Sequence, residues 1–265
     1  MLSKDTVVKF LKETESRFEK FTAEYNPSGE VKKKSWDTPM GKLDVIISKG
    51  ETFEKLSSIY CDLLVDTPPV LAEKLGQKGS KAEALVLEFH FFPINPYIAK
   101  GYIELRANVT GNIVLAGGTD IFPYYSNESD NNLFGDAMKE LCKRHGKDYE
   151  ALRQERIGFF KSKYRKGGKI GSHAGIYSFK LEENDFEFFK DMADTYFNVY
   201  VEIIERRKNE KFGQKEIEHK LKTHGLWVEW TMMEDEGTLF GIRKGIPPES
   251  LLGSILPPQA TFSID

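Results

Sequence analysis

The pattern of apolar and polar positions predicts helices and strands in separate blocks of the chain. Apolar residues recur at helical spacing over residues 5–25, and Pro27-Ser28-Gly29 follows as a helix stop. Residues 45–50 and 56–65 are apolar enough for strands. The run Lys32-Lys33-Lys34 before them is typical of a solvated loop.

From Ala84 the pattern changes to a period of two. It predicts strands over residues 84–92, 102–109 and 113–116, the last of them ended by Gly117-Gly118. Short connections between consecutive strands favour an antiparallel meander. Before this block, Asp66-Thr67-Pro68-Pro69 indicates a turn, and residues 71–81 indicate a short helix or a loop.

Helical spacing dominates the second half of the chain. It predicts helices over residues 129–145, 148–163, 184–211 and 214–223. Residues 227–242 then predict two strands around a tight turn at Glu236-Gly237, followed by a short helix stopped by Pro257-Pro258. Strands at both ends with helices between them predict one α+β domain over residues 1–265, whose last hairpin joins the central sheet.

Composition narrows the classes of function. The chain has 265 residues and a net charge of −3, so no overall basic field favours nucleic acid or an anionic membrane. An anionic ligand would need a local cluster of Lys and Arg. No apolar run approaches the roughly 18 residues of a membrane span, which predicts a soluble cytoplasmic protein without integral membrane association. Cys61 and Cys142 are expected to be reduced structural thiols.

The sequence predicts neither a metal site nor a nucleotide loop. None of the five histidines pairs with another at the i, i+4 spacing of a helical metal site. The Gly-rich segment 166–171 does not follow a buried strand, so it is interpreted as a flexible basic loop, with phosphate binding as the less favoured alternative.

One strand of the predicted meander carries candidate chemistry. With a period of two, Tyr102, Glu104 and Arg106 point to one face of the sheet. A phenol, an acid and a guanidinium on one cleft floor could orient and deprotonate a substrate N–H or C–H group. The alternative, that Tyr102 and Arg106 cover a wet sheet face, stays open at this point.

Three ordered blocks of the chain resemble a known family. They are Pro93-Ile94-Asn95-Pro96-Tyr97, Gly117–Tyr125, and the C-terminal stretch Trp227–Pro258. These blocks resemble motifs of the oxygen-dependent coproporphyrinogen III oxidases, which convert two propionates of a porphyrinogen to vinyl groups in haem biosynthesis. The resemblance spans about residues 45–265, and residues 1–44 are expected to form a helical N-terminal extension.

The resemblance implies a fold and a way of working. It implies α+β architecture with a large antiparallel β-sheet flanked by helices on both faces, a homodimer, and an active-site cleft above the sheet. It also implies a heteroaromatic or tetrapyrrole substrate, no cofactor, and dioxygen as co-substrate. Asp120 and Asp235 match the two family acids that meet pyrrole N–H groups, and Arg106 matches a family arginine.

The same resemblance supplies candidate catalytic and substrate-binding residues. The catalytic candidates are Tyr102, Glu104, Arg106, Asp120 and Asp235. The substrate-binding candidates are Arg165, Trp230, Glu236, Gly237, Thr238, Phe240, Arg243 and Lys244.

Several departures from the family pattern bear on the substrate. A family arginine is replaced by Glu236, and the family's Gly-Gly-Arg by Gly245-Ile246-Pro247. A porphyrinogen with four propionates carries about four negative charges near neutral pH, and guanidinium groups are the matching partners. Arg243 and Lys244 either compensate for the loss or are surface charges.

These departures favour a diverged family member. The predicted activity is oxygen-dependent, cofactor-free oxidation, including oxidative decarboxylation, of an electron-rich pyrrole- or indole-like compound with fewer carboxylates. Two alternatives remain. One is a genuine coproporphyrinogen III oxidase, and the other is a non-catalytic protein that binds a tetrapyrrole or a peptide.

Overall fold

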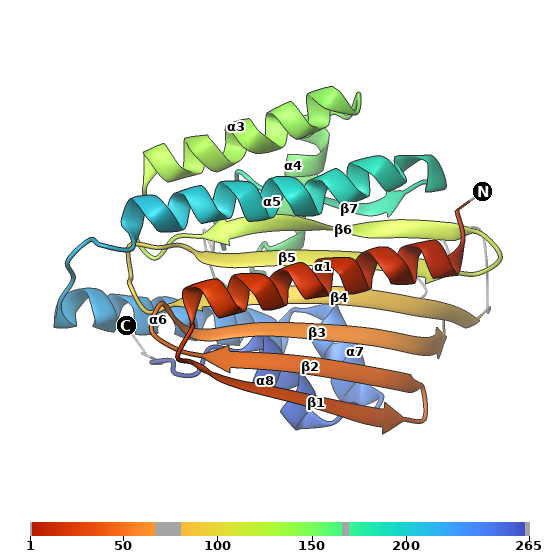
Figure 1. Ribbon diagram of the computed structural model, residues 1–265, viewed down its shortest axis with the longest axis horizontal. Helices are drawn as coiled ribbons and strands as arrows, with labels where there is room; N and C mark the ends of the chain where they lie inside the picture. Colours follow the sequence, from red (N-terminus) through yellow and green to blue (C-terminus); the bar gives the residue numbers. More distant parts are fainter. Residues whose placement is uncertain (1, 67–80, 166–169, 263–265) are drawn as a thin grey trace.

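A seven-stranded antiparallel sheet forms the centre of the structure (Figure 1). The computed structural model describes residues 2–66, 81–165 and 170–262. The strands follow one another in the sheet in chain order, so the topology is a meander. They are β1 (Glu30–Thr38), β2 (Gly41–Lys49), β3 (Phe53–Asp66), β4 (Lys81–Pro93), β5 (Lys100–Val109), β6 (Ile113–Phe122) and β7 (Ile176–Leu181).

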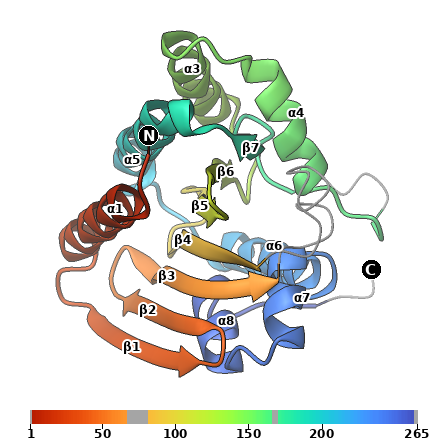
Figure 2. The ribbon, with the colours of Figure 1, turned by 90° about the vertical axis from the view of Figure 1, so that its right-hand side faces the viewer.

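Helices cover both faces of this sheet, which confirms the predicted fold class (Figure 2). Helices α1 (Lys4–Tyr25) and α5 (Phe186–Arg207) lie on one face, with α3 (Glu128–Arg144) outside α5. Helices α6 (Gln214–Met233), α7 (Glu236–Arg243) and α8 (Pro248–Ile255) lie on the opposite face. Helix α4 (Tyr149–Phe159) lies beside β7 at one edge.

Because side chains alternate along the middle strands, the two faces of these strands lie in different environments. Phe89 and Phe91 of β4 pack against Phe18 of α1 and Phe197 of α5, in the main apolar core. On the other face, Phe92 and Tyr102 belong to a smaller aromatic cluster with Trp227 of α6. The main core therefore lies on one face of these strands, and the smaller aromatic cluster lies on the other.

The N-terminal part of the chain is only partly helical. Helix α1 confirms the helix expected over residues 5–25. The Lys32-Lys33-Lys34 run is not a loop, however, because it lies within β1, the exposed strand at one edge of the sheet. Residues 30–38 therefore form a strand rather than part of a helical extension, and exposure at the edge is what permits so many lysines there.

Strand β6 is longer than expected. It was predicted to stop at Gly117-Gly118, but it continues to Phe122. Gly117 has a φ of +135°, which favours glycine, and a Cβ on Gly118 would lie 2.2 Å from the carbonyl oxygen of Ile176 in β7. The two glycines thus admit β7 at close range instead of ending the strand, and β7 itself was not predicted.

The C-terminal hairpin expected over residues 227–242 is wrong. Helix α6 runs on to Met233, and α7 starts at Glu236. The buried residues His224, Trp227, Trp230 and Thr231 are spaced three, three and one apart, which places them on one face of a helix. The final short helix is confirmed as α8, and the predicted segments within residues 67–80 and 166–169 lie outside the described residues.

Candidate active site

A row of polar side chains crosses the sheet face beneath α6. The Tyr102 hydroxyl donates a hydrogen bond to Glu104 Oε2 at 3.0 Å, and the Arg106 guanidinium donates to Glu104 Oε1. Tyr102 and Glu104 are buried, whereas the Arg106 side chain is 34% exposed. The three residues therefore share a face as predicted, and only the Arg106 end of the row opens to solvent.

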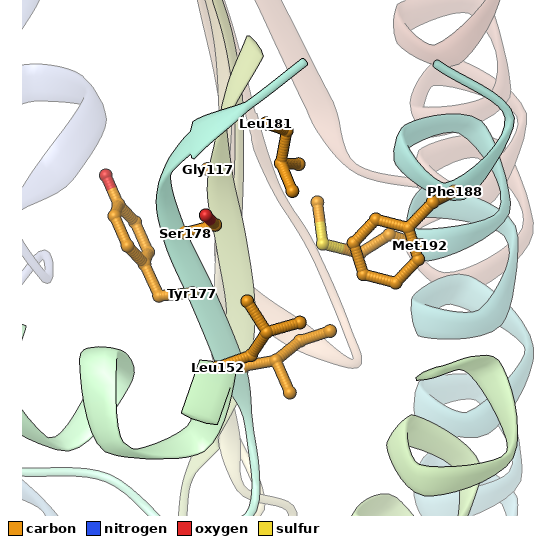
Figure 3. A pocket seen from close by; sticks show the side chains of 8 residues that line it. Gly117, Leu152, Tyr177, Ser178, Leu181, Phe188 and Met192 are labelled. Carbon is orange, nitrogen blue, oxygen red and sulfur yellow. The ribbon is translucent and has the colours of Figure 1, made fainter. Parts of the chain in front are cut away.

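Tyr177 of β7 completes the row from the neighbouring edge. Its hydroxyl donates to the same Glu104 oxygen at 3.0 Å. Tyr177 is the cross-strand neighbour of Gly118, which leaves room for the ring. Figure 3 shows Tyr177 pointing to the opposite side of β7 from Phe188 and Met192. The gap lined by those two side chains is too narrow for a water molecule, so the polar chemistry lies on the Tyr177 side.

Burial sets the protonation of this row. The pKa values of Tyr102 and Tyr177 are raised well above the ordinary range by burial and by the negative charge of Glu104. Both phenols therefore keep their protons and act as donors. Two phenols and one guanidinium supply three donors to Glu104, an arrangement that suits a carboxylate.

A second carboxyl group stands next to Glu104. Glu88 of β4 is its cross-strand partner. Burial raises the pKa of Glu88 well above its ordinary value, and the charges of Glu104 and Asp235 raise it further. Glu88 Oε1 lies 2.8 Å from His90 Nε2 but is not aligned for a hydrogen bond. The environment therefore favours a protonated Glu88 next to the hydrogen-bonded Glu104.

Asp120 is not open to a ligand in this structure. Its Oδ1 accepts hydrogen bonds from the Ser172 hydroxyl at 2.5 Å and from the Ile121 amide at 2.8 Å. Its Oδ2 forms an ion pair with Arg156 of α4, and both side chains are fully buried. Burial raises the pKa of Asp120 and the Arg156 charge opposes the rise.

Asp235 stands at the start of α7. Its side chain accepts hydrogen bonds from the Thr238 amide at 3.0 Å and the Thr238 hydroxyl at 2.5 Å, which makes it the N-cap of that helix. Burial raises its pKa, and the charge of Glu104 adds to the rise. This electrostatic influence indicates that Asp235 lies near the polar row.

Aromatic rings of α6 and α4 pack over the same face. Trp227 and Trp230 have ring centroids 5.5 Å apart, and the Trp230 centroid lies 4.8 Å from that of Phe160. Trp227 lies 6.3 Å from Tyr102. Trp230 is therefore part of the aromatic cover of the row.

Comparison with known proteins places this arrangement in a family. The family model for coproporphyrinogen III oxidase matches residues 6–265. The chain belongs to the coproporphyrinogen III oxidase family.

Curated members of this family support the assignment. The chain is 30% identical over 246 residues to an oxygen-dependent coproporphyrinogen-III oxidase of Francisella philomiragia, covering 85% of this chain and 78% of that protein. The enzyme of Francisella tularensis subsp. novicida is 29% identical over the same length and coverage. Most of the length of these relatives is therefore shared.

A solved structure shows the same fold at low identity. Tomato phytochromobilin synthase in complex with biliverdin aligns with a TM-score of 0.53 and 11% identity, covering 85% of this chain and 74% of that one. The likeness concerns architecture alone. The family model also extends the match to residue 6, well before the start at about residue 45 that the motifs indicated.

The coproporphyrinogen oxidase motif positions in α7 and beyond lie mostly on the surface. The Glu236 side chain is 75% exposed and 3.8 Å from Arg243, which is itself 66% exposed. Lys244 pairs with Asp66 at 3.0 Å and is 40% exposed. Gly237 lies in the first turn of α7, Thr238 is buried against Asp235, and Phe240 packs on the apolar cluster of α8 and β2.

Arg165 is also paired outside the polar row. It forms two hydrogen bonds to the Glu229 carboxylate of α6, at 2.7 and 2.6 Å, and its side chain is 45% exposed. Of the arginines considered from the sequence, Arg106 is thus the one that the structure places in the polar row.

Several residues near this row were missed. Lys100 could have been found, because it lies two residues before Tyr102 on β5 and so shares its face. Glu88 joins the row through its pairing with Glu104 across the sheet, which no local signal gives. Arg156 and Tyr177 reach the row from α4 and β7, and no local signal connects them to it.

Within residues 2–66, 81–165 and 170–262, no three His, Cys, Asp or Glu side chains gather as metal ligands would. Over the same ranges, no helix combines the length and apolarity needed to cross a bilayer.

Proposed function

We propose that this family member is an oxygen-dependent oxidoreductase acting on an electron-rich pyrrole- or indole-like compound with fewer carboxylates than coproporphyrinogen. The reaction uses dioxygen as co-substrate and no further cofactor, and includes oxidative decarboxylation among its outcomes. The observation that carries the proposal is the single partly exposed guanidinium, Arg106, at the open end of a row that otherwise holds carboxyls and phenols.

The row has groups for both parts of such a substrate. Arg106 can take one substrate carboxylate in a charge-assisted hydrogen bond. Glu104, which receives hydrogen bonds from its neighbours, is suited to accept a ring N–H proton. Glu88, whose raised pKa favours the protonated form, is suited to return a proton. Drawing the N–H proton toward a carboxylate raises the electron density of the ring and favours its reaction with dioxygen.

The charge balance of the site supports a substrate with few carboxylates. Glu236 and Arg243 are exposed and face each other, and Lys244 pairs with Asp66. Four propionates would find one guanidinium in the row, Arg106, which is already paired with Glu104. The remaining substrate carboxylates would lie without a charged partner in a largely buried site, which is unfavourable.

A second candidate is coproporphyrinogen itself. It is favoured by the 30% identity to the Francisella enzymes over most of their length. Binding of a tetrapyrrole without turnover is the third reading, and the biliverdin complex of the tomato protein is compatible with it.

One experiment separates the three. The purified protein is incubated in air with coproporphyrinogen, and separately with a panel of pyrrole and indole carboxylic acids, while dissolved oxygen and product mass are followed. Oxygen consumption with a panel compound but not with coproporphyrinogen supports the proposal. Efficient formation of protoporphyrinogen would replace it with the pathway reaction. Tight porphyrin binding with no oxygen consumption in any arm would favour a binding protein.

A further inference from the structure

Three basic side chains gather around Phe92 beneath α6, and the proposed function has not used them. We name Lys55, His90 and Lys100 the basic cluster. They come from β3, β4 and β5, and each is at most 3% exposed. Lys55 Nζ lies 5.1 Å and Lys100 Nζ 5.3 Å from the Phe92 ring centroid, and the His90 ring centroid lies 6.2 Å from it.

Two members of the basic cluster have polar atoms without a hydrogen-bond partner. They are Lys100 Nζ, whose neighbours are aromatic rings at cation–π range, and both ring nitrogens of His90, of which Nε2 lies 2.8 Å from Glu88 Oε1 without hydrogen-bond alignment. Lys55 differs, since it donates to the carbonyl oxygens of Gly253 and Leu256 at the end of α8. Buried donors without acceptors are unfavourable and rare in native proteins. An oxyanion is the ligand that would satisfy Lys100 and His90 together.

The charges around the basic cluster also favour an anionic ligand. Burial lowers the pKa of Lys100 well below its ordinary value, with Lys55 lowering it and Glu88 and Asp120 raising it. Burial also lowers the pKa of His90, and the charges of Lys100 and Lys55 add to that effect. The other titratable groups that face Lys100 are Tyr102 on β5, Arg156 on α4 and His224 on α6. An entering anion would reverse the balance and favour the ammonium form.

The surroundings of Lys100 are flat and aromatic. Its Nζ lies 3.4 Å from the Trp227 ring centroid, 4.4 Å from that of Phe122 and 5.6 Å from that of Tyr102. Such rings stack on another ring rather than on a flexible chain. Trp227 belongs to α6 and is held by a hydrogen bond of 2.9 Å to the Ile255 carbonyl of α8. Entry of a ligand therefore requires Trp227 to move.

We propose that the basic cluster binds the carboxylate of an aromatic ring acid, with Lys100 as its main partner, and that Lys100 takes up a proton from solvent when the ligand binds. The proposal deepens the proposed function and rests on it for the substrate class. It adds a second anchor, distinct from Arg106, at the inner end of the polar row.

Calorimetry tests this without turnover. Indole-3-propionate is titrated into the protein at pH 8 in Tris and in HEPES, whose ionisation enthalpies differ, and indole-3-propionamide serves as the uncharged ligand. The wild type is expected to bind the propionate with net uptake of protons and to bind the amide about 10- to 100-fold more weakly. Lys100→Met, which keeps an unbranched apolar chain, should lose the proton uptake and bind both ligands alike.

Control and contrary outcomes are distinct. Lys143→Met removes an amine that is 77% exposed on α3 and should behave as wild type. If Lys100→Met does not fold, Lys100→Gln, which does not titrate, takes its place. The inference would be overturned if the Lys100 variant bound the propionate with unchanged affinity and proton uptake. It would also be overturned if the wild type did not bind the propionate. Proton-coupled binding without oxygen consumption for any substrate would instead leave the inference standing and remove the proposed oxidation.

Discussion

Glu88 and Glu104 are cross-strand partners on β4 and β5, yet their surroundings differ sharply. Glu104 receives hydrogen bonds from Tyr102, Tyr177 and Arg106. Glu88 has only the unaligned approach of His90, and its environment favours the protonated form. Two adjacent carboxyls in such different surroundings suit the roles of an acid and a base.

Glu88→Gln should change how stability depends on pH. The pKa of Glu88 is raised above its value of 4.5 in an unfolded chain, so the folded state binds this proton more tightly. The wild type should therefore lose stability as pH rises above about 4.5 toward the raised pKa. Gln does not ionise, so the variant should be the more stable form at pH 8, by about 1.4 kcal/mol for each unit of the shift.

Urea unfolding at pH 4 and pH 8 measures this difference. Glu140→Gln, on the exposed surface of α3, is the matched control and should leave the pH dependence as in the wild type. Equal pH dependence for Glu88→Gln and wild type would show that the pKa of Glu88 is not raised as its environment indicates.

Arg106→Ala should greatly reduce turnover at low substrate concentration while leaving the fold intact. Its side chain is 34% exposed, so its loss creates no closed cavity, but the anchor for a substrate carboxylate disappears. We expect KM to rise about 10- to 100-fold, the size of a lost charge-assisted hydrogen bond, with a far-UV circular dichroism spectrum like that of the wild type. Arg243→Ala, on the surface of α7, is the paired variant and should keep its activity. If Arg243→Ala raised KM and Arg106→Ala did not, the substrate carboxylate would bind at α7 instead.

The middle of the fold could be predicted from sequence, and the C-terminal part could not. Strands β4 and β5 alternate because one face packs into the main apolar core and the other carries the polar row, whereas β6 is buried along its whole length. In α6, the bulky residues Trp227 and Trp230 have high β propensity, which locally favours a strand. Packing of one helical face over the sheet decided the outcome instead.

The candidate site divides in a similar way. Tyr102, Glu104 and Arg106 were found because strand alternation is a local rule. The pairing of Asp120 with Arg156 and the reach of Tyr177 over Gly118 depend on contacts between distant segments. Glu236 could not be placed because its exposure depends on α7 being a helix.

Asp235→Ala and Asp235→Asn should separate two roles of one carboxylate. Asp235 caps α7 through Thr238, so Ala should lower the free energy of unfolding by about 1 kcal/mol, whereas Asn keeps an acceptor and should lose little. Thermal unfolding gives that comparison. Activity assays on the same proteins complete it, since an Asn variant that is stable but inactive would require the carboxylate charge in the reaction. Full activity in Asp235→Asn would assign the residue to the cap alone.

Asp120→Asn should be strongly destabilising because it leaves Arg156 charged and unpaired in a fully buried place. Removing one partner of such a pair costs about 3–5 kcal/mol. The double variant Asp120→Asn with Arg156→Met removes both charges, so it should recover much of that loss in urea unfolding.

If the double variant is stable but inactive, Asp120 acts on the substrate after Arg156 is displaced. If it is stable and active, the buried pair serves the fold, and the acid chemistry belongs to Glu88, Glu104 and Asp235. A single Asp120→Asn variant as stable as the wild type would contradict the ion pair itself.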